Sequence, residues 1–179
     1  MKKKIARLVC CLFKLLYVIQ VEAQKKPDSK ISIRHSYTIK RIESVKSILF
    51  VYEGDAWLTR KYVNLSKRLQ KRFKKRYQLG FHYKLDTKNG YEEELGYIPR
   101  ETNKNIKPDL ICKLKSYGLK RKKEKYTSEF SYTYQMKFEM IDPATDGLIE
   151  FAELELFSYH TPYDNNKALV KLLDKIITE

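Results

Sequence analysis

The chain has 179 residues, of which 42% are hydrophobic and 33% charged, and its formal net charge is +15. This length fits a single domain, and the hydrophobic share, with 14 Tyr and 8 Phe, excludes a globally disordered chain. The positive charge favours anionic partners, which include nucleic acid, lipopolysaccharide, anionic lipid and acidic proteins.

Residues 1–23 have the three-part pattern of a cleavable secretory signal. A short basic start precedes an apolar run over 8–21, and a cleavage site follows at Ala23. The run is shorter than the ~20 residues of a membrane-spanning helix. We therefore expect a periplasmic or secreted protein whose mature chain begins at Gln24 and keeps a net charge of +11, from 32 basic and 21 acidic residues.

A second interpretation of this segment stays open. Lys14 and Gln20 interrupt the apolar run, and a basic amphipathic helix, cytosolic or on a membrane surface, has a similar pattern. Cys10 and Cys11 lie near the start of the run, which argues against a lipid anchor. Cys112 would then be the single cysteine of the mature chain, and its apolar neighbours predict a buried structural thiol.

The first half of the mature chain predicts a strand, a helix and a strand. Residues 24–45 predict a polar leader followed by an edge strand, and the β-rich run over 47–52 is typical of a buried central strand. Asp55 is placed to cap a helix over 56–76, where apolar residues recur at steps of three and four. Alternation over 79–85 predicts a half-buried strand.

The polar face of the predicted helix is densely basic. We take it as the first candidate contact surface for an anionic partner, such as the phosphates of a lipid or a nucleic acid. The alternative is a solvated face that only keeps the helix soluble. The candidate contact residues are Arg60, Lys61, Lys67, Arg68, Lys71, Lys74 and Lys75.

The middle of the chain predicts a long loop, a strand and a charged connection. Residues 86–107 lack clear periodicity and predict a long loop. A strand over 109–115 follows, and the run of charges over 118–125 predicts a connection between strands.

The last third predicts a hairpin and a helix. Alternation over 130–140 is the strongest strand signal in the chain, and a turn at 142–147 leads into a partner strand over 148–159. The apolar phase slips near Phe151, which indicates a bulge. Apolar spacing then predicts a C-terminal helix that Asp164 could cap.

This order of elements over 46–179 predicts one α+β domain, a two-layer sandwich. Its mixed sheet has about five strands, with two main helices packed on one face in the order β-α-β-β-β-β-α.

Three segments resemble a known group of envelope-assembly domains. They are the strand, helix and strand over 47–85, the run from Lys107 to Leu114, and the hairpin over 132–156, whose tip reads from Ile141 to Ile149. The group includes curli-secretion lipoproteins, lipoprotein activators of penicillin-binding proteins and the N-terminal domain of the Tol system's β-propeller protein. The resemblance implies a non-enzymatic periplasmic domain that docks on other envelope components.

No motif indicates catalysis or a cofactor. The sequence lacks the nucleophile elbow, the phosphate loop and the dinucleotide fingerprint. The three histidines, His35, His82 and His160, do not have metal-ligand spacing. Asp142 and Asp146 could hold calcium, although a turn there needs such residues anyway. We therefore expect no enzyme, no metal and no cofactor.

One aromatic cluster has two interpretations. Tyr126, Phe130, Tyr132, Tyr134 and Phe138 could form a stacking platform for nucleic-acid bases, but a buried sheet face requires the same alternation.

Taken together, these features predict a non-catalytic, exported binding or assembly accessory of the cell envelope. Its expected partner is an envelope protein or an anionic envelope component. The alternative is a basic nucleic-acid-binding domain retained in the cytosol.

Overall fold

The computed structural model describes residues 29–39, 44–86, 106–123 and 129–178. The predicted signal over 1–23, the start of the predicted leader and nearly all of the predicted loop over 86–107 lie outside the described residues. Among the described residues, no helix is both long enough and apolar enough to cross a bilayer.

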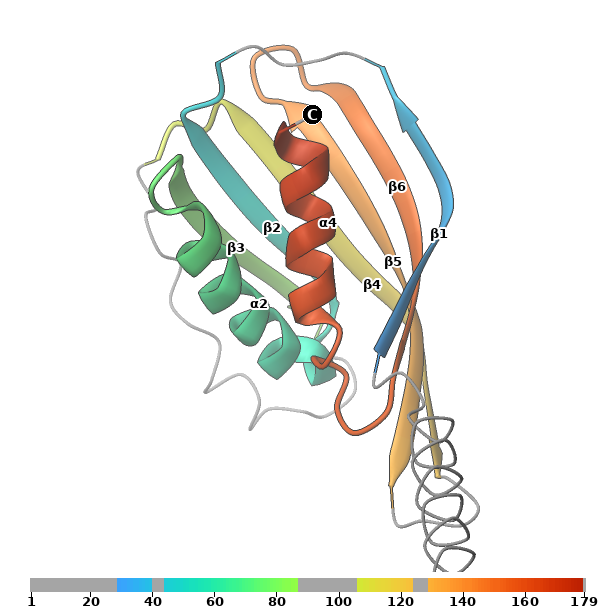
Figure 1. Ribbon diagram of the computed structural model, residues 1–179. Coiled ribbons are helices and arrows are strands. Elements are labelled where there is room, and N and C mark those ends of the chain that lie inside the picture. Colours follow the sequence, from blue (N-terminus) through green and yellow to red (C-terminus); the bar gives the residue numbers. More distant parts are fainter. Residues whose placement is uncertain (1–28, 40–43, 87–105, 124–128, 179) are drawn as a thin grey trace, which may run out of the picture.

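The described strands form one mixed sheet in the order β1-β6-β5-β4-β2-β3 (Figure 1). Strand β2 runs parallel to both β3 and β4, and the other neighbours are antiparallel. The strands are β1 (Ser29–Thr38), β2 (Ser47–Asp55), β3 (Gln78–Asp86), β4 (Leu110–Lys123), β5 (Phe130–Asp142) and β6 (Gly147–Ser158).

Two α-helices, α2 (Thr59–Phe73) and α4 (Asn166–Thr178), lie side by side on one face of this sheet (Figure 1). Their inner faces and the helix-facing side chains of β2, β4, β5 and β6 form the core, in which Tyr52, Tyr62 and Phe138 are completely buried. The predicted α+β sandwich with helices on one face is therefore confirmed. The sheet has six strands rather than about five, because the predicted N-terminal edge strand pairs with β6 along most of its length.

The segment before α2 contains the Asp55 cap that the sequence predicts. The side chain of Asp55 accepts a 2.8 Å hydrogen bond from the backbone N–H of Trp57. This bond closes a short 3₁₀ helix (Ala56–Leu58), after which α2 begins at Thr59.

The predicted connection over 118–125 is wrong, because β4 continues to Lys123. Residues from Lys120 to Lys123 pair with β5, where Lys123 lies opposite Phe130. A register shift after Tyr117 and a positive φ of 65° at Gly118 mark a bulge at which the strand changes direction. Pairing with β5 thus overrides the low strand propensity of a lysine run whose side chains remain exposed.

The predicted hairpin and its bulge are confirmed with a small displacement. Met140 pairs with Glu150 but Ile141 pairs with Leu148, so Ile149 is the extra residue, two positions before Phe151. At the tip, the Asp142 carboxylate accepts a 2.9 Å hydrogen bond from the N–H of Ala144, as a turn requires.

The prediction that Asp164 caps the C-terminal helix is wrong. The carboxylate of Asp164 accepts hydrogen bonds from the N–H and the hydroxyl of Thr161, at 2.7 and 2.6 Å. It therefore closes the turn that precedes α4. The first helical carbonyl bond joins the Leu169 N–H to the carbonyl of Asn165, at 2.9 Å.

Candidate functional site

The basic side of α2 faces away from the sheet. Leu65, Leu69 and Phe73 on the opposite side are completely buried in the core, which fixes the rotation of the helix. No acidic residue occurs anywhere in residues 56–85. The predicted contact residues that are exposed, which we call the α2 cation face, are Arg60, Lys67, Arg68, Lys71, Lys74 and Lys75.

Lys61, the remaining predicted contact residue, does not belong to this surface. It is 0% exposed and lies in the layer between α2 and the sheet. Helical rotation explains the error, because position 61 lies next to Tyr62 and Leu65 on the inner face, and only the positive charge suggested an outward position.

The amine of Lys61 is held by one hydroxyl and two aromatic rings. It donates a 3.2 Å hydrogen bond to the Ser116 hydroxyl and lies 4.2 Å from the centre of the Tyr134 ring and 5.1 Å from that of Tyr62. Burial without a carboxylate partner lowers the pKa of Lys61 well below its usual range.

Two further cations near the end of α2 share one carboxylate of α4. Asp174 accepts hydrogen bonds from Arg72 and Arg76, one of them from Arg72 Nε at 2.7 Å. Burial raises the pKa of Asp174, but the hydrogen bonds from Arg76 and Arg72 outweigh it and leave that pKa below its usual value. We call these contacts of Asp174 with Arg72 and Arg76 the clamp. Residue spacing within one helix could not reveal it, because Asp174 is 98 residues from Arg76 in sequence.

No carboxylate in the described part of the chain pairs with the lysines of the α2 cation face. Among the described residues, Lys67, Lys71, Lys74 and Lys75 form no ion pair, and Arg68 Nε donates to the neutral side chain of Asn64 at 2.8 Å. The positive charge of these four lysines is therefore available to an anion in solvent.

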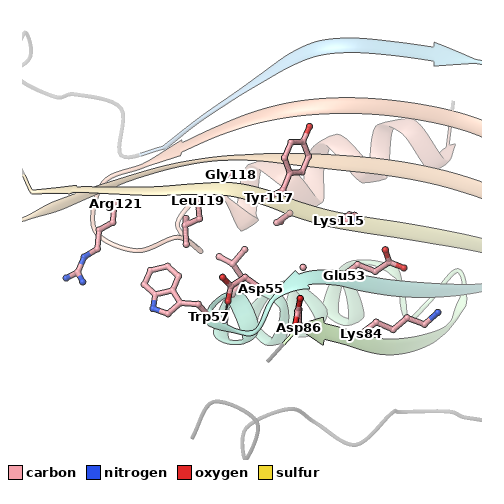
Figure 2. Close-up of a pocket in the computed structure, with 13 residues that line it drawn as sticks. Glu53, Asp55, Trp57, Lys84, Asp86, Lys115, Tyr117, Gly118, Leu119 and Arg121 are labelled. Carbon is pink, nitrogen blue, oxygen red and sulfur yellow. Dashed lines mark hydrogen bonds between the residues drawn. The ribbon is translucent and has the colours of Figure 1, made fainter. Parts of the chain in front are cut away.

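A second feature is a groove of about 790 Å³ at the point where β2 and β4 separate (Figure 2). The two strands pair as far as Glu53 and Lys115, and then β2 turns into the 3₁₀ helix while β4 continues beside β5. The groove is lined by Glu53, Gly54, Asp55, Trp57, Leu58, Lys84, Asp86, Lys115, Ser116, Tyr117, Gly118, Leu119 and Arg121.

At one end of the groove, an aromatic ring and a cation each pack against an aromatic ring of β5. The Trp57 indole packs against Tyr132 with a centroid distance of 5.7 Å, and the Arg121 guanidinium lies 3.7 Å from the centre of the Phe130 ring. Figure 2 shows Trp57 and Arg121 at the same end, with Asp55 and Asp86 between them and Lys84. The sequence did not predict this groove, because it depends on the path of β4 beyond Gly118.

The aromatic cluster is part of the core rather than a stacking platform. Tyr134 and Phe138 are completely buried, Tyr132 is buried and Phe130 is half-buried, while Tyr126 lies outside the described residues. The Tyr134 hydroxyl donates to the carbonyl of Pro162 or the side-chain oxygen of Asn165, each at 2.8 Å. The rings therefore serve packing.

The remaining candidate groups have structural partners. Cys112 is completely buried, and burial raises the pKa of its thiol, as a structural cysteine requires. In the described part of the chain, no group of three or more His, Cys, Asp or Glu side chains is arranged to hold a metal ion.

No family model and no curated protein matches this sequence. Among solved structures, a PelC dodecamer from Paraburkholderia phytofirmans has a TM-score of 0.42 at 8% identity, over 84% of this chain and 95% of that chain. A lipoprotein from Neisseria meningitidis has a TM-score of 0.35 at 12% identity, over 74% and 94%. A neuraminyllactose-binding hemagglutinin homologue from Helicobacter pylori has a TM-score of 0.37 at 13% identity, over 80% and 88%. Likeness at this level assigns no function.

Proposed function

We propose that this protein is an exported, non-catalytic binding or assembly accessory of the cell envelope, and that it docks on an anionic partner through the α2 cation face. The observation that carries the proposal is the array of exposed lysines on α2 and in the turn after it, which form no ion pair with the described residues and lie in a stretch, 56–85, without acidic residues. The predicted signal at residues 1–23 supplies the location, and an anionic lipid surface or an acidic envelope protein supplies the complementary charge.

The lysines suit a broad anionic surface better than a single small anion. Lys67 and Lys71 lie one turn apart on α2, and Lys75 follows in the turn after the helix ends at Phe73. We call these three lysines the stripe. Lysine amines are flexible point charges, which attract distributed negative charge without fixing one geometry. Such a surface increases the rate of encounter and makes binding sensitive to salt.

The test reverses three charges of the stripe, as Lys67→Glu, Lys71→Glu and Lys75→Glu together. Binding to phosphatidylcholine vesicles with and without phosphatidylglycerol, and cross-linking in an envelope fraction, are then compared with wild type. The matched control reverses Lys30, Lys107 and Lys137, which are exposed, do not line the groove and give the same change in net charge.

Loss of vesicle binding or of the cross-linked product in the stripe variant alone would support the proposal. Equal losses in both variants would show that total charge, rather than the α2 cation face, attracts the partner. Location is tested separately by the intact mass of the native protein from fractionated cells. A full-length cytosolic species would instead favour the nucleic-acid alternative.

A further inference from the structure

The carboxyl half of β4 has one edge without a strand partner. Its first half pairs with β2 from Leu110 to Lys115, and residues from Ile111 to Lys123 pair with β5 on the other side, with a bulge after Tyr117. The N–H of Ser116 donates a 3.1 Å hydrogen bond to the Tyr62 hydroxyl. Among the described strands, none pairs with the β2-side edge of residues 117–123, and this edge forms one wall of the groove (Figure 2). Backbone N–H and C=O groups along such an edge can pair with an added strand.

The separation of β2 from β4 is built into the chain. Gly54 lies at the branch point with a φ of 128°, and a Cβ added there would meet the Ser116 carbonyl oxygen at 2.5 Å. Only glycine permits this close approach immediately before β2 leaves the sheet. At Gly118, by contrast, an added Cβ would have no heavy atom within 4 Å, so β4 is not packed closely against another described element at this residue.

The side chains around this edge define the chemistry of an added strand. Lys120, Arg121, Lys122 and Lys123 are four consecutive exposed cations. Trp57 and Leu119 supply apolar surface beside them. Asp55 and Asp86 lie at the other side of Trp57, so negative charge is favoured only along the outer part of the edge (Figure 2).

We infer that the groove is a strand-addition site, in which an extended acidic segment of a partner protein pairs with residues 117–123 of β4. Main-chain hydrogen bonds to β4 would provide affinity, and alternate side chains of the segment would provide specificity. An apolar side chain would lie on Trp57, and glutamate or aspartate side chains would meet Arg121 and its neighbouring lysines. This site is separate from the α2 cation face and recognises an extended peptide rather than an anionic surface.

Trp57 provides a direct readout, because it is the only tryptophan of the chain. The probe is the capped peptide Glu-Glu-Val-Val-Glu-Glu-Leu-Val, which contains no aromatic residue and presents both glutamate and apolar side chains on each face of an extended strand. Titration into the full chain should give a saturable change in Trp57 emission. A probe in which lysine replaces every glutamate should bind at least about tenfold more weakly.

Backbone pairing is tested with two N-methylated forms of the probe. Alternate amides of an added strand face β4, and the others face solvent. Methylation of one alternate set should therefore abolish binding, whereas methylation of the other set should leave it nearly unchanged. If neither set or both sets weakened binding equally, the strand-addition geometry would be wrong.

The protein variants are Arg121→Glu and Lys123→Glu, with Lys171→Glu on the exposed side of α4 as the matched control. The first two should weaken probe binding by about tenfold or more with unchanged circular dichroism, and the control should not. The α2 stripe variant should also bind the probe normally, which separates this inference from the proposed function. Absence of any saturable emission change up to about 1 mM probe would overturn the inference.

Discussion

The amine of Lys61 lies 3.2 Å from the hydroxyl of Ser116, in a layer that solvent does not reach. No carboxylate accompanies this pair among the residues that affect the pKa of Lys61, and the Tyr134 ring covers the amine at 4.2 Å. A lysine in this position costs stability, because burial removes its hydration and one hydroxyl with two ring contacts offsets only part of that loss.

Replacing Lys61 with methionine should therefore stabilise the fold. Lys61→Met keeps an unbranched side chain of similar length and removes the amine, and we expect the free energy of unfolding at pH 7 to rise by about 1 kcal/mol. Urea denaturation followed by far-ultraviolet circular dichroism measures the change. Lys61→Ala is the control for packing, since its cavity should lower the same free energy by about 2 kcal/mol or more.

The pH dependence of stability should identify the amine as the cause. The pKa of Lys61 is lower in the folded chain than in the unfolded chain, so between these two values the unfolded chain binds more protons. The free energy of unfolding of the wild type should then rise with pH up to about 10.4, the ordinary lysine value. A Lys61→Met variant that showed the same rise would exclude Lys61 as its origin.

Lys61 also shows what the sequence could and could not reveal. Apolar spacing correctly predicted α2, and alternation correctly predicted β5 and β6, because these signals are local. Residue 61 lies on the inner face beside Tyr62, whereas the sequence predicted it on the outer face, because a positive charge is normally a reliable sign of exposure. The burial of Lys61 depends on the Ser116 hydroxyl and the Tyr134 ring. These groups belong to β4 and β5, so they contact Lys61 only once the sheet has formed.

The clamp between α2 and α4 gives a second prediction. Asp174→Asn should lower the free energy of unfolding by about 1 kcal/mol at pH 7, because Arg72 and Arg76 lose their shared carboxylate. The expected change is modest, since the two arginine side chains are 57% and 42% exposed. Glu155→Gln is the matched control, because the Arg34–Glu155 pair is exposed on both sides and should contribute little.

The same clamp should weaken in acid. The pKa of Asp174 lies below its ordinary value in the folded chain, so its contribution is present above the unfolded value of about 3.9 and disappears as pH falls through the folded value. Wild type and Asp174→Asn should therefore differ in urea midpoint at pH 7 and converge near pH 2. A constant difference across this range would mean that the substitution acts through packing rather than charge.

The edge of the groove shows a second limit of sequence analysis. A run such as Lys120 to Lys123 has low strand propensity, so it predicts a connection when read alone. Phe130 and Tyr132 of β5 lie opposite Lys123 and Arg121, and the arginine within the run packs on Phe130. Cross-strand partners thus determine the conformation of this segment, and the groove exists only because β4 continues past the end of β2.

The thiol of Cys112 should be unreactive in the folded protein. It is completely buried, and burial raises its pKa, so very little thiolate forms and reagents cannot reach it. In a Cys10→Ser and Cys11→Ser background, we expect reaction with a disulfide reagent at pH 8 to be at least about a hundredfold slower than in urea. Equal rates would place Cys112 outside the core.

Gly54 and Gly118 form a matched pair for the branch point of β2 and β4. Both have positive φ values, 128° and 65°, but only Gly54 is against another backbone, since a Cβ added there would lie 2.5 Å from the Ser116 carbonyl oxygen. Gly54→Ala should therefore lower the free energy of unfolding by about 3 kcal/mol or prevent folding, whereas Gly118→Ala should cost about 1 kcal/mol, the ordinary penalty of a left-handed alanine. Thermal unfolding of both variants measures the difference. Similar losses would mean that backbone conformation alone, and not the approach of Gly54 to Ser116, fixes the point at which the strands separate.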